Sequence, residues 1–107
     1  MDTFKEYQTI ATSIPISLRN NRDRILLPVT ALQQEAGKIG AVFARALDAQ
    51  HGGLTPEQSR ELKERMGDVL WCIAMLSVEI KVPLQEIAEE SAKLLQARRA
   101  ELGQDQR

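Results

Sequence analysis

Apolar residues recur at the three- and four-residue spacing of amphipathic helices along most of this chain, and the interruptions divide it into four segments. We expect helices over about residues 2–13, 28–49, 56–80 and 83–102. Pro15 ends the first helix, and Pro28 is acceptable in the first turn of the second because the N–H groups there have no partner within the helix. The polar run Asn20-Asn21-Arg22-Asp23 is assigned to a connecting segment. Short connections between four helices predict an all-α fold, a four-helix bundle.

The clearest boundary separates the second helix from the third. Gln50-His51-Gly52-Gly53 ends the second helix, and Thr55-Pro56-Glu57-Gln58 begins the third with an N-cap threonine, a first-position proline and a capping-box glutamine. His51 is the only histidine, and with no second ligand nearby it is interpreted as a loop residue. At its end the fourth helix is expected to fray near Gly103 into a disordered tail, Gln104-Asp105-Gln106-Arg107.

Each of the last three helices carries an apolar stripe that we assign to the core. In the second helix a partly charged face adjoins the stripe, so a site on that face would be partly buried. The core stripes are Leu32, Ala36, Ile39 and Phe43; then Leu62, Met66, Val69, Ile73 and Leu76; then Leu84, Ile87, Ser91, Leu94 and Leu95. The adjoining face of the second helix consists of Ala31, Glu35, Lys38 and Val42.

One stretch of the third helix, from Asp68 to Val78, is apolar on nearly all sides. An amphipathic helix packed on one core does not need this, so the stretch is expected to face both its own core and a second subunit. Trp71 and Met75 are the interface candidates, and ordinary core packing is the alternative for both.

Composition is that of one small helical domain covering residues 1–107. The chain is 43% hydrophobic and 27% charged with 4% aromatic residues, which favours helices over sheet. A net charge of -1 argues against a nucleic-acid or membrane-surface partner. The single cysteine, Cys72, excludes a disulfide framework and fits a reducing cytoplasm; it is interpreted as a small buried hydrophobe. No leader or membrane-spanning run is recognised, so a cytoplasmic location is expected.

Two short stretches share one arrangement of charges around a glycine: Glu35-Ala36-Gly37-Lys38 and Arg65-Met66-Gly67-Asp68. Residues three apart lie on the same helix face, so each stretch presents two charged groups side by side. A glycine inside a helix costs roughly 1 kcal/mol relative to alanine, which suggests that the helices approach closely at these positions. The two stretches are therefore interpreted as halves of one site.

This arrangement resembles the MazG-like nucleoside triphosphate pyrophosphohydrolases, all-α enzymes with a metal site of Glu-x-x-Glu on one helix and Glu-x-x-Asp on the next. The similarity extends over nearly the whole chain. The segments that carry it are Phe4-Lys5-Glu6-Tyr7-Gln8, Ala31-Leu32-Gln33-Gln34-Glu35-Ala36-Gly37-Lys38-Ile39, Gly67-Asp68-Val69-Leu70-Trp71, and Pro83-Leu84-Gln85-Glu86-Ile87-Ala88-Glu89 with Lys93-Leu94.

The resemblance implies a reaction, a cofactor and an assembly. The family reaction is Mg²⁺-dependent attack of water on a nucleoside triphosphate, which yields the monophosphate and pyrophosphate. In this chain Glu35 and Asp68 match the family's catalytic and metal-binding carboxylates, and Lys93 matches a phosphate contact. The family also implies a homodimer or homotetramer with pockets between helices.

The chain departs from the family where Lys38 and Arg65 replace two metal-binding glutamates. Four carboxylates carry about four negative charges and require a cation among them, whereas the four positions here sum to zero. If the helices run antiparallel, Lys38 is expected to pair with Asp68 and Arg65 with Glu35. Catalysis would then be weak or lost, and Lys38 and Arg65 could instead contact phosphates directly.

Other carboxylates offer an alternative metal site. Glu61 and Glu64 share a helix face with Asp68, and Glu90 precedes Lys93 by three residues. With Glu35 they could form a displaced oxygen-ligand cluster; the alternative interpretation is that they are ordinary surface charges. Three function classes therefore stay open: a working pyrophosphohydrolase, a non-catalytic nucleotide-binding or regulatory relative, and a helical oligomerisation module.

Overall fold

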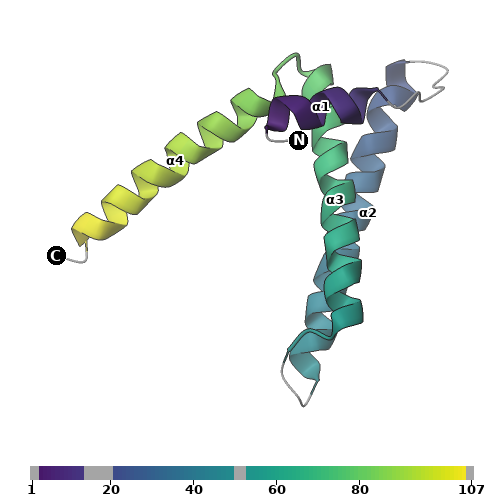
Figure 1. The fold of residues 1–107 in the computed structure, drawn as a ribbon, viewed down its shortest axis with the longest axis vertical. Coiled ribbons are helices and arrows are strands. Elements are labelled where there is room, and N and C mark those ends of the chain that lie inside the picture. Colours follow the sequence, from purple (N-terminus) through teal and green to yellow (C-terminus); the bar gives the residue numbers. More distant parts are fainter. Residues whose placement is uncertain (1–2, 14–20, 50–52, 106–107) are drawn as a thin grey trace.

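The computed structural model describes residues 3–13, 21–49 and 53–105, and these form helices without a strand. The helices are α1 (Phe4–Thr12), α2 (Asn21–Asp48), α3 (Pro56–Glu79) and α4 (Leu84–Asp105). Both α1 and α2 pack against α3, and α4 contacts α1 and α3 but not α2 (Figure 1). The prediction of an all-α helical fold is confirmed. In the described part of the chain, no helix is long and apolar enough to cross a bilayer.

The two longest helices, α2 and α3, form an antiparallel hairpin along most of their lengths (Figure 1). The start of α3 is capped as expected: Thr55 Oγ1 accepts a hydrogen bond from the Gln58 N–H at 3.1 Å, and Gln58 Oε1 accepts one from the Thr55 N–H at 2.9 Å. Pro56 occupies the first turn, where its missing N–H has no consequence. The predicted boundary at Thr55 is thus confirmed, while Gln50, His51 and Gly52 lie outside the described residues.

Burial along the hairpin follows the alternating three- and four-residue spacing of a coiled-coil seam. The buried or half-buried positions at this spacing are Pro28, Leu32, Glu35, Ile39, Val42 and Ala46 on α2, and Leu62, Arg65, Val69, Cys72 and Leu76 on α3; further positions of α3, such as Ala74 and Ser77, are buried on the side of α1. One consequence contradicts the expected core of α2. Ala36 and Phe43 are exposed, whereas Val42, assigned to the adjoining face, is buried. The reason is that α2 packs against a single helix, which covers only a narrow stripe.

The start of α2 also differs from the prediction. The helix begins at Asn21, so Arg22 and Asp23 are helical and Pro28 lies inside the helix rather than in its first turn. A proline within a helix removes one backbone hydrogen bond, here the bond to the Arg24 carbonyl. The extra turns have a compensating contact, since Arg24 Nε pairs with Glu79 Oε1 at 2.8 Å at the far end of α3. Residues 14–20, including Pro15, lie outside the described residues.

A small apolar cluster joins α1, α3 and α4. Ala11, Ala74 and Leu84 are its buried members, and Tyr7, Trp71 and Ile73 pack against it. The turn after α3 directs the chain into α4 through a Schellman motif: the Lys81 N–H donates to Val78 O and the Val82 N–H to Ser77 O, each at 3.1 Å. Lys81 takes the left-handed conformation that this motif needs, with φ of 60°.

The side-chain amide of Gln8, on α1, forms hydrogen bonds with both α3 and α4. Its Nε2 donates to the Ser77 hydroxyl and to Ala74 O, at 3.2 Å for the carbonyl, while its Oε1 accepts from the Leu84 N–H at 3.0 Å. The Leu84 N–H is one of the first in α4 and has no partner within the helix. One side chain therefore satisfies groups on two other helices.

Beyond its first two turns, α4 leaves the rest of the molecule (Figure 1). Leu84 is buried and Ile87 half-buried, but every residue from Glu89 to Gly103 is exposed. The expectation that Ser91, Leu94 and Leu95 point into a core is wrong for the single chain, because no other helix of the chain covers them. The helix also continues through Gly103 to Asp105, beyond the predicted fraying point. Of the predicted tail, Gln106 and Arg107 lie outside the described residues.

The junction at Gln8 can be tested by substitution. Gln8→Ala removes all three hydrogen bonds and leaves the Leu84 N–H at the start of α4 without a partner, so the free energy of unfolding should fall by about 2–3 kcal/mol. Urea unfolding followed by circular dichroism measures this, with Lys5→Ala on the exposed face of α1 as the control. Equal unfolding free energies for the two variants would contradict the role assigned to Gln8.

Candidate functional site

The antiparallel hairpin places Glu35 of α2 opposite Arg65 of α3. Arg65 Nη1 donates to both carboxylate oxygens of Glu35, at 3.1 Å to Oε2 and 3.3 Å to Oε1. Its Nε donates to Glu61 Oε1 at 3.2 Å, one turn earlier on α3. The Lys38 ammonium lies 3.7 Å from Glu35 Oε1. We call Glu35, Lys38, Glu61 and Arg65 the ion-pair network.

Glu35 and Arg65 lie within the hairpin seam and Lys38 and Glu61 at its edge, so the network is only partly solvated. The Glu35 side chain is 13% exposed and that of Arg65 27%, while Lys38 is 52% exposed. A carboxylate at this depth needs a cationic or hydrogen-bonding partner. The hydrogen bonds that Arg65 donates to Glu35 and Glu61 also raise the pKa of its guanidinium. Arg65 therefore stays charged and holds the α2 carboxylate in place.

One of the two expected crossed ion pairs is present and the other is not. Arg65 pairs with Glu35 as predicted. Lys38 instead pairs with Glu35 on its own helix, and no Lys38–Asp68 pair occurs in the described part of the chain. Asp68 is exposed and lies toward Tyr7 and Cys72, where its charge contributes to raising the pKa of both. Asp68 thus lies close enough to Tyr7 of α1 to act on its phenol, and it is not the partner of Lys38.

The two glycines do not mark a close helix approach within one chain. Gly37 and Gly67 are both exposed, and a Cβ built on either would meet no heavy atom within 4 Å. Both positions face away from the seam, whose close contacts come from other residues. The expectation that these glycines allow the helices to approach is therefore wrong for the hairpin of a single chain.

The residues present do not fit a magnesium ion. Within residues 3–13, 21–49 and 53–105, no three His, Cys, Asp or Glu side chains lie together in a way that could hold a metal. Mg²⁺ requires octahedral oxygen coordination, and both oxygens of Glu35 already accept hydrogen bonds from Arg65. The four members of the ion-pair network also sum to zero charge. No step that uses a metal follows from this geometry.

The displaced carboxylate cluster is not assembled in the single chain. Glu61 is bound to Arg65, and Glu64 is exposed on α3. Glu90 lies on α4, which has no contact with α2. The structure thus brings Glu35 and Glu61 to one guanidinium, and among the described residues no third carboxylate joins them in a group that could hold a metal.

Lys93 lies far from the ion-pair network, in a shallow groove on α4 among Glu86, Glu89 and Glu90. Three carboxylates around one ammonium make a poor site for a phosphate. Within one chain, the phosphate contacts inferred for Lys38, Arg65 and Lys93 therefore do not converge on one pocket.

Cys72 is buried at the centre of α3, as the sequence suggested. Burial raises the pKa of its thiol, and the nearby charges of Asp68 and Glu35 raise it further. Trp71 and Met75, the interface candidates, are half-buried. The indole Nε1 of Trp71 is enclosed and has no hydrogen-bond partner among the described residues.

Sequence reasoning missed the part played by Tyr7 and Gln8. Both were part of the segment that carries the family resemblance, yet neither was given a role. Tyr7 is half-buried on α1 near Asp68, and burial is the main cause of its raised pKa. No local signal distinguishes a glutamine that joins three helices from an ordinary surface glutamine, because its partners are 66 to 76 residues away.

A curated relative, the Gene 37 protein of Mycobacterium phage L5, is 31% identical to this chain over 65 residues. The aligned part covers 61% of this chain and 57% of the phage protein, so the chain spans less than two thirds of that relative's length. No protein-family model matches the chain, and no solved structure matches it. The name of the phage protein states no activity.

The Glu35–Arg65 pair predicts a measurable coupling. Arg65→Gln leaves the half-buried Glu35 carboxylate with Lys38 alone and should lower the urea midpoint, whereas Arg60→Gln on the exposed face of α3 should not. Adding Glu35→Gln should recover part of the loss, since it removes the unpaired charge. A double-mutant cycle measures the coupling between the two residues. Strictly additive effects would show that the pair is not an energetic unit.

Cys72 should react slowly in the folded protein. A thiol whose folded-state pKa is raised stays protonated, so its contribution to stability is complete below the unfolded pKa of about 8.5 and is lost as the pH rises further. Near neutral pH, alkylation should be on the order of 100-fold slower than in denaturing urea, because it requires opening of the hairpin. Mass spectrometry follows the reaction at this single cysteine. Rapid labelling of the folded chain would contradict the burial.

Proposed function

We propose that this chain is a MazG-like helical protein in which the ion-pair network stands in place of the metal site, so that it works without hydrolysing nucleoside triphosphates. The observation that carries the proposal is the hydrogen bonding of both Glu35 oxygens by Arg65. The motif similarity described above supports the family assignment. The loss of hydrolysis is supported by chemistry, because Mg²⁺ needs several free carboxylates both to be held and to orient water.

Binding of a nucleotide without a metal receives less support. The guanidinium of Arg65 already serves two carboxylates, and the ion-pair network carries no net positive charge to attract a triphosphate. The role that remains is that of a cytoplasmic helical module acting through its assembled surface. A homodimer or homotetramer fits this role.

Assembly is supported by how little apolar surface one chain buries. The buried apolar residues are few and mostly small, whereas large side chains on every helix are more than one third exposed. A chain of this size gains stability from association, because a small domain buries only a limited fraction of its surface. The described chain thus has the surface of a subunit rather than of a free-standing monomer.

The test compares three proteins for pyrophosphate release from ribo- and deoxynucleoside triphosphates with Mg²⁺ or Mn²⁺. The wild type should release none above background. The double variant Lys38→Glu, Arg65→Glu should bind Mg²⁺, seen as a metal-dependent rise in Tm, and gain release. The control, Arg60→Glu with Lys63→Glu, makes the same charge change on exposed positions of α3 and should do neither.

Two outcomes decide between the proposal and a working enzyme. Wild-type turnover that is lost in Glu35→Gln and Asp68→Asn would overturn the proposal and show that carboxylates from another subunit complete the site. A silent wild type whose double variant responds to Mg²⁺ would support a scaffold with a neutralised metal site.

A further inference from the structure

The chain exposes far more surface than a compact protein of its size. Its accessible surface is 8374 Å², against about 6,000 Å² expected for a folded monomer of 12.0 kDa. Its radius of gyration is 17.4 Å, against about 13 Å for a compact domain. The excess is about 2,400 Å² per chain, or about 4,800 Å² for two chains, which lies in the range that permanent interfaces bury in total. Association through a large surface would bury this excess accessible surface.

Much of this exposed surface belongs to α4. The side chains of Leu94, Leu95 and Leu102 are 55%, 59% and 62% exposed, although they lie on one stripe of the helix. Ile87, Ser91, Leu94 and Arg98 follow one another at the alternating four- and three-residue spacing of a coiled-coil seam, and Leu95 and Leu102 lie along one edge of it. A seam of this kind is built to pack against another helix. No helix of the same chain covers its second half.

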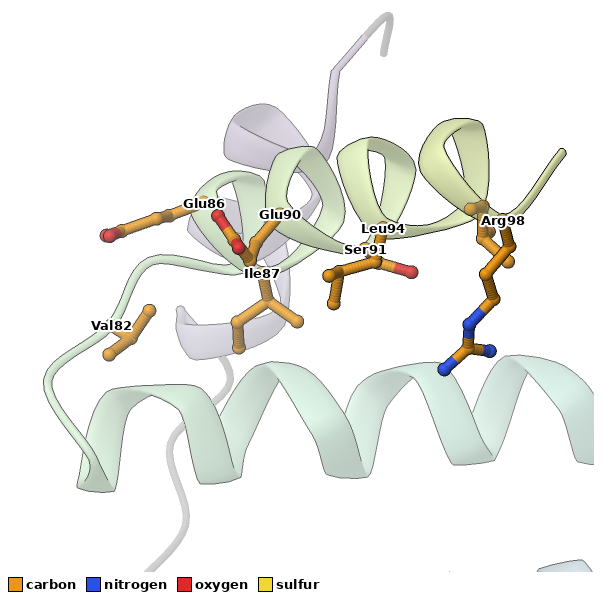
Figure 2. Close-up of a pocket in the computed structure, with 8 residues that line it drawn as sticks. Val82, Glu86, Ile87, Glu90, Ser91, Leu94 and Arg98 are labelled. Carbon is orange, nitrogen blue, oxygen red and sulfur yellow. The ribbon is translucent and has the colours of Figure 1, made fainter. Parts of the chain in front are cut away.

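The charges along this face differ between its two ends. Glu86 and Glu90 line the first half of the groove on α4 and Arg98 lines the second, with Ile87, Leu94 and Leu95 between them. Figure 2 shows Ile87 and Arg98 both directed from α4 toward the space beside α3. None of Glu86, Glu90 and Arg98 forms an ion pair within the described residues. The groove is therefore apolar in the middle, acidic at one end and basic at the other.

This distribution of charge is complementary to a helix whose acidic and basic ends lie in the opposite order. A second α4 placed antiparallel to the first has that order. In an antiparallel pair, Arg98 of each chain meets the glutamates of the other, and the leucines meet at the centre. In a parallel pair, Arg98 would face Arg98 and Glu90 would face Glu90, which is repulsive. A two-fold axis through the middle of α4 makes the surface complementary to itself.

We infer that α4 pairs antiparallel with α4 of a second copy of this chain, with Leu94 near the two-fold axis and Arg98 of each copy against Glu86 and Glu90 of the other. This inference rests on the homo-oligomeric assembly proposed above and adds the surface and its polarity. Burial of Leu94 and Leu95 in the pair supplies the apolar contact that a single chain lacks.

Charge reversal tests the pairing. Sedimentation equilibrium should show the wild type as a dimer or a higher even oligomer. The variants Arg98→Glu and Glu86→Arg with Glu90→Arg should each dissociate at least about tenfold more readily, because like charges then meet at both ends. An equimolar mixture of the two variants should recover wild-type affinity as a mixed dimer. Lys63→Glu makes the same charge change as Arg98→Glu at an exposed position of α3 and is the control for that variant.

Cysteine cross-linking tests the polarity independently. Under mild oxidation, Leu94→Cys should give a disulfide-linked dimer because position 94 lies near the two-fold axis, whereas Leu102→Cys should not. Circular dichroism confirms that each variant stays helical.

The outcomes separate the two proposals. A monomeric wild type would overturn both the assembly and the α4 pairing. An oligomer whose dissociation is unchanged in both charge variants would overturn the α4 pairing alone, as would efficient cross-linking through position 102.

Discussion

The antiparallel packing of α2 on α3 is the constraint on which the rest of the structure depends. It forms most of the contacts between helices, and its seam combines apolar side chains with one charged layer. That layer is the pair of Glu35 and Arg65, joined by two hydrogen bonds. An ion pair inside an apolar seam contributes little net stability, but it disfavours registers that leave either charge unpaired. The same contact thus aligns the helices and determines the chemistry of the site.

The chemical consequence is a site that needs no ion. A cluster of carboxylates repels itself and is held together by a cation, whereas Arg65 and Lys38 supply that positive charge from the chain itself. Arg65 also donates a hydrogen bond to Glu61 on its own helix, so two carboxylates share the charge of one guanidinium. The fold of the described residues therefore does not depend on a metal for the charge balance of this layer.

The contacts among α1, the end of α3 and the start of α4 determine the direction of α4. Gln8 joins α1 to the last turns of α3 and to the first N–H groups of α4, and Lys81 closes the turn between them. These contacts hold only the beginning of α4, so the remainder extends away from the hairpin (Figure 1). A helix held at one end and apolar along one face is suited to packing against a second molecule rather than its own.

The sequence by itself determined the all-α class, the capping box at Thr55, the burial of Cys72 and the pairing of Glu35 with Arg65. These follow from local periodicity, from turn chemistry and from the opposite charges of two halves of one site. It did not determine that α2 begins at Asn21, because the Arg24–Glu79 contact that accompanies the extra turns joins residues far apart in the chain. Nor did it determine that Lys38 turns to Glu35 and Asp68 toward Tyr7, or that the apolar stripe of α4 is uncovered. Periodicity reveals which residues share a helix face, but only the tertiary structure decides what that face meets, because the directions in which helices leave their turns depend on long-range contacts.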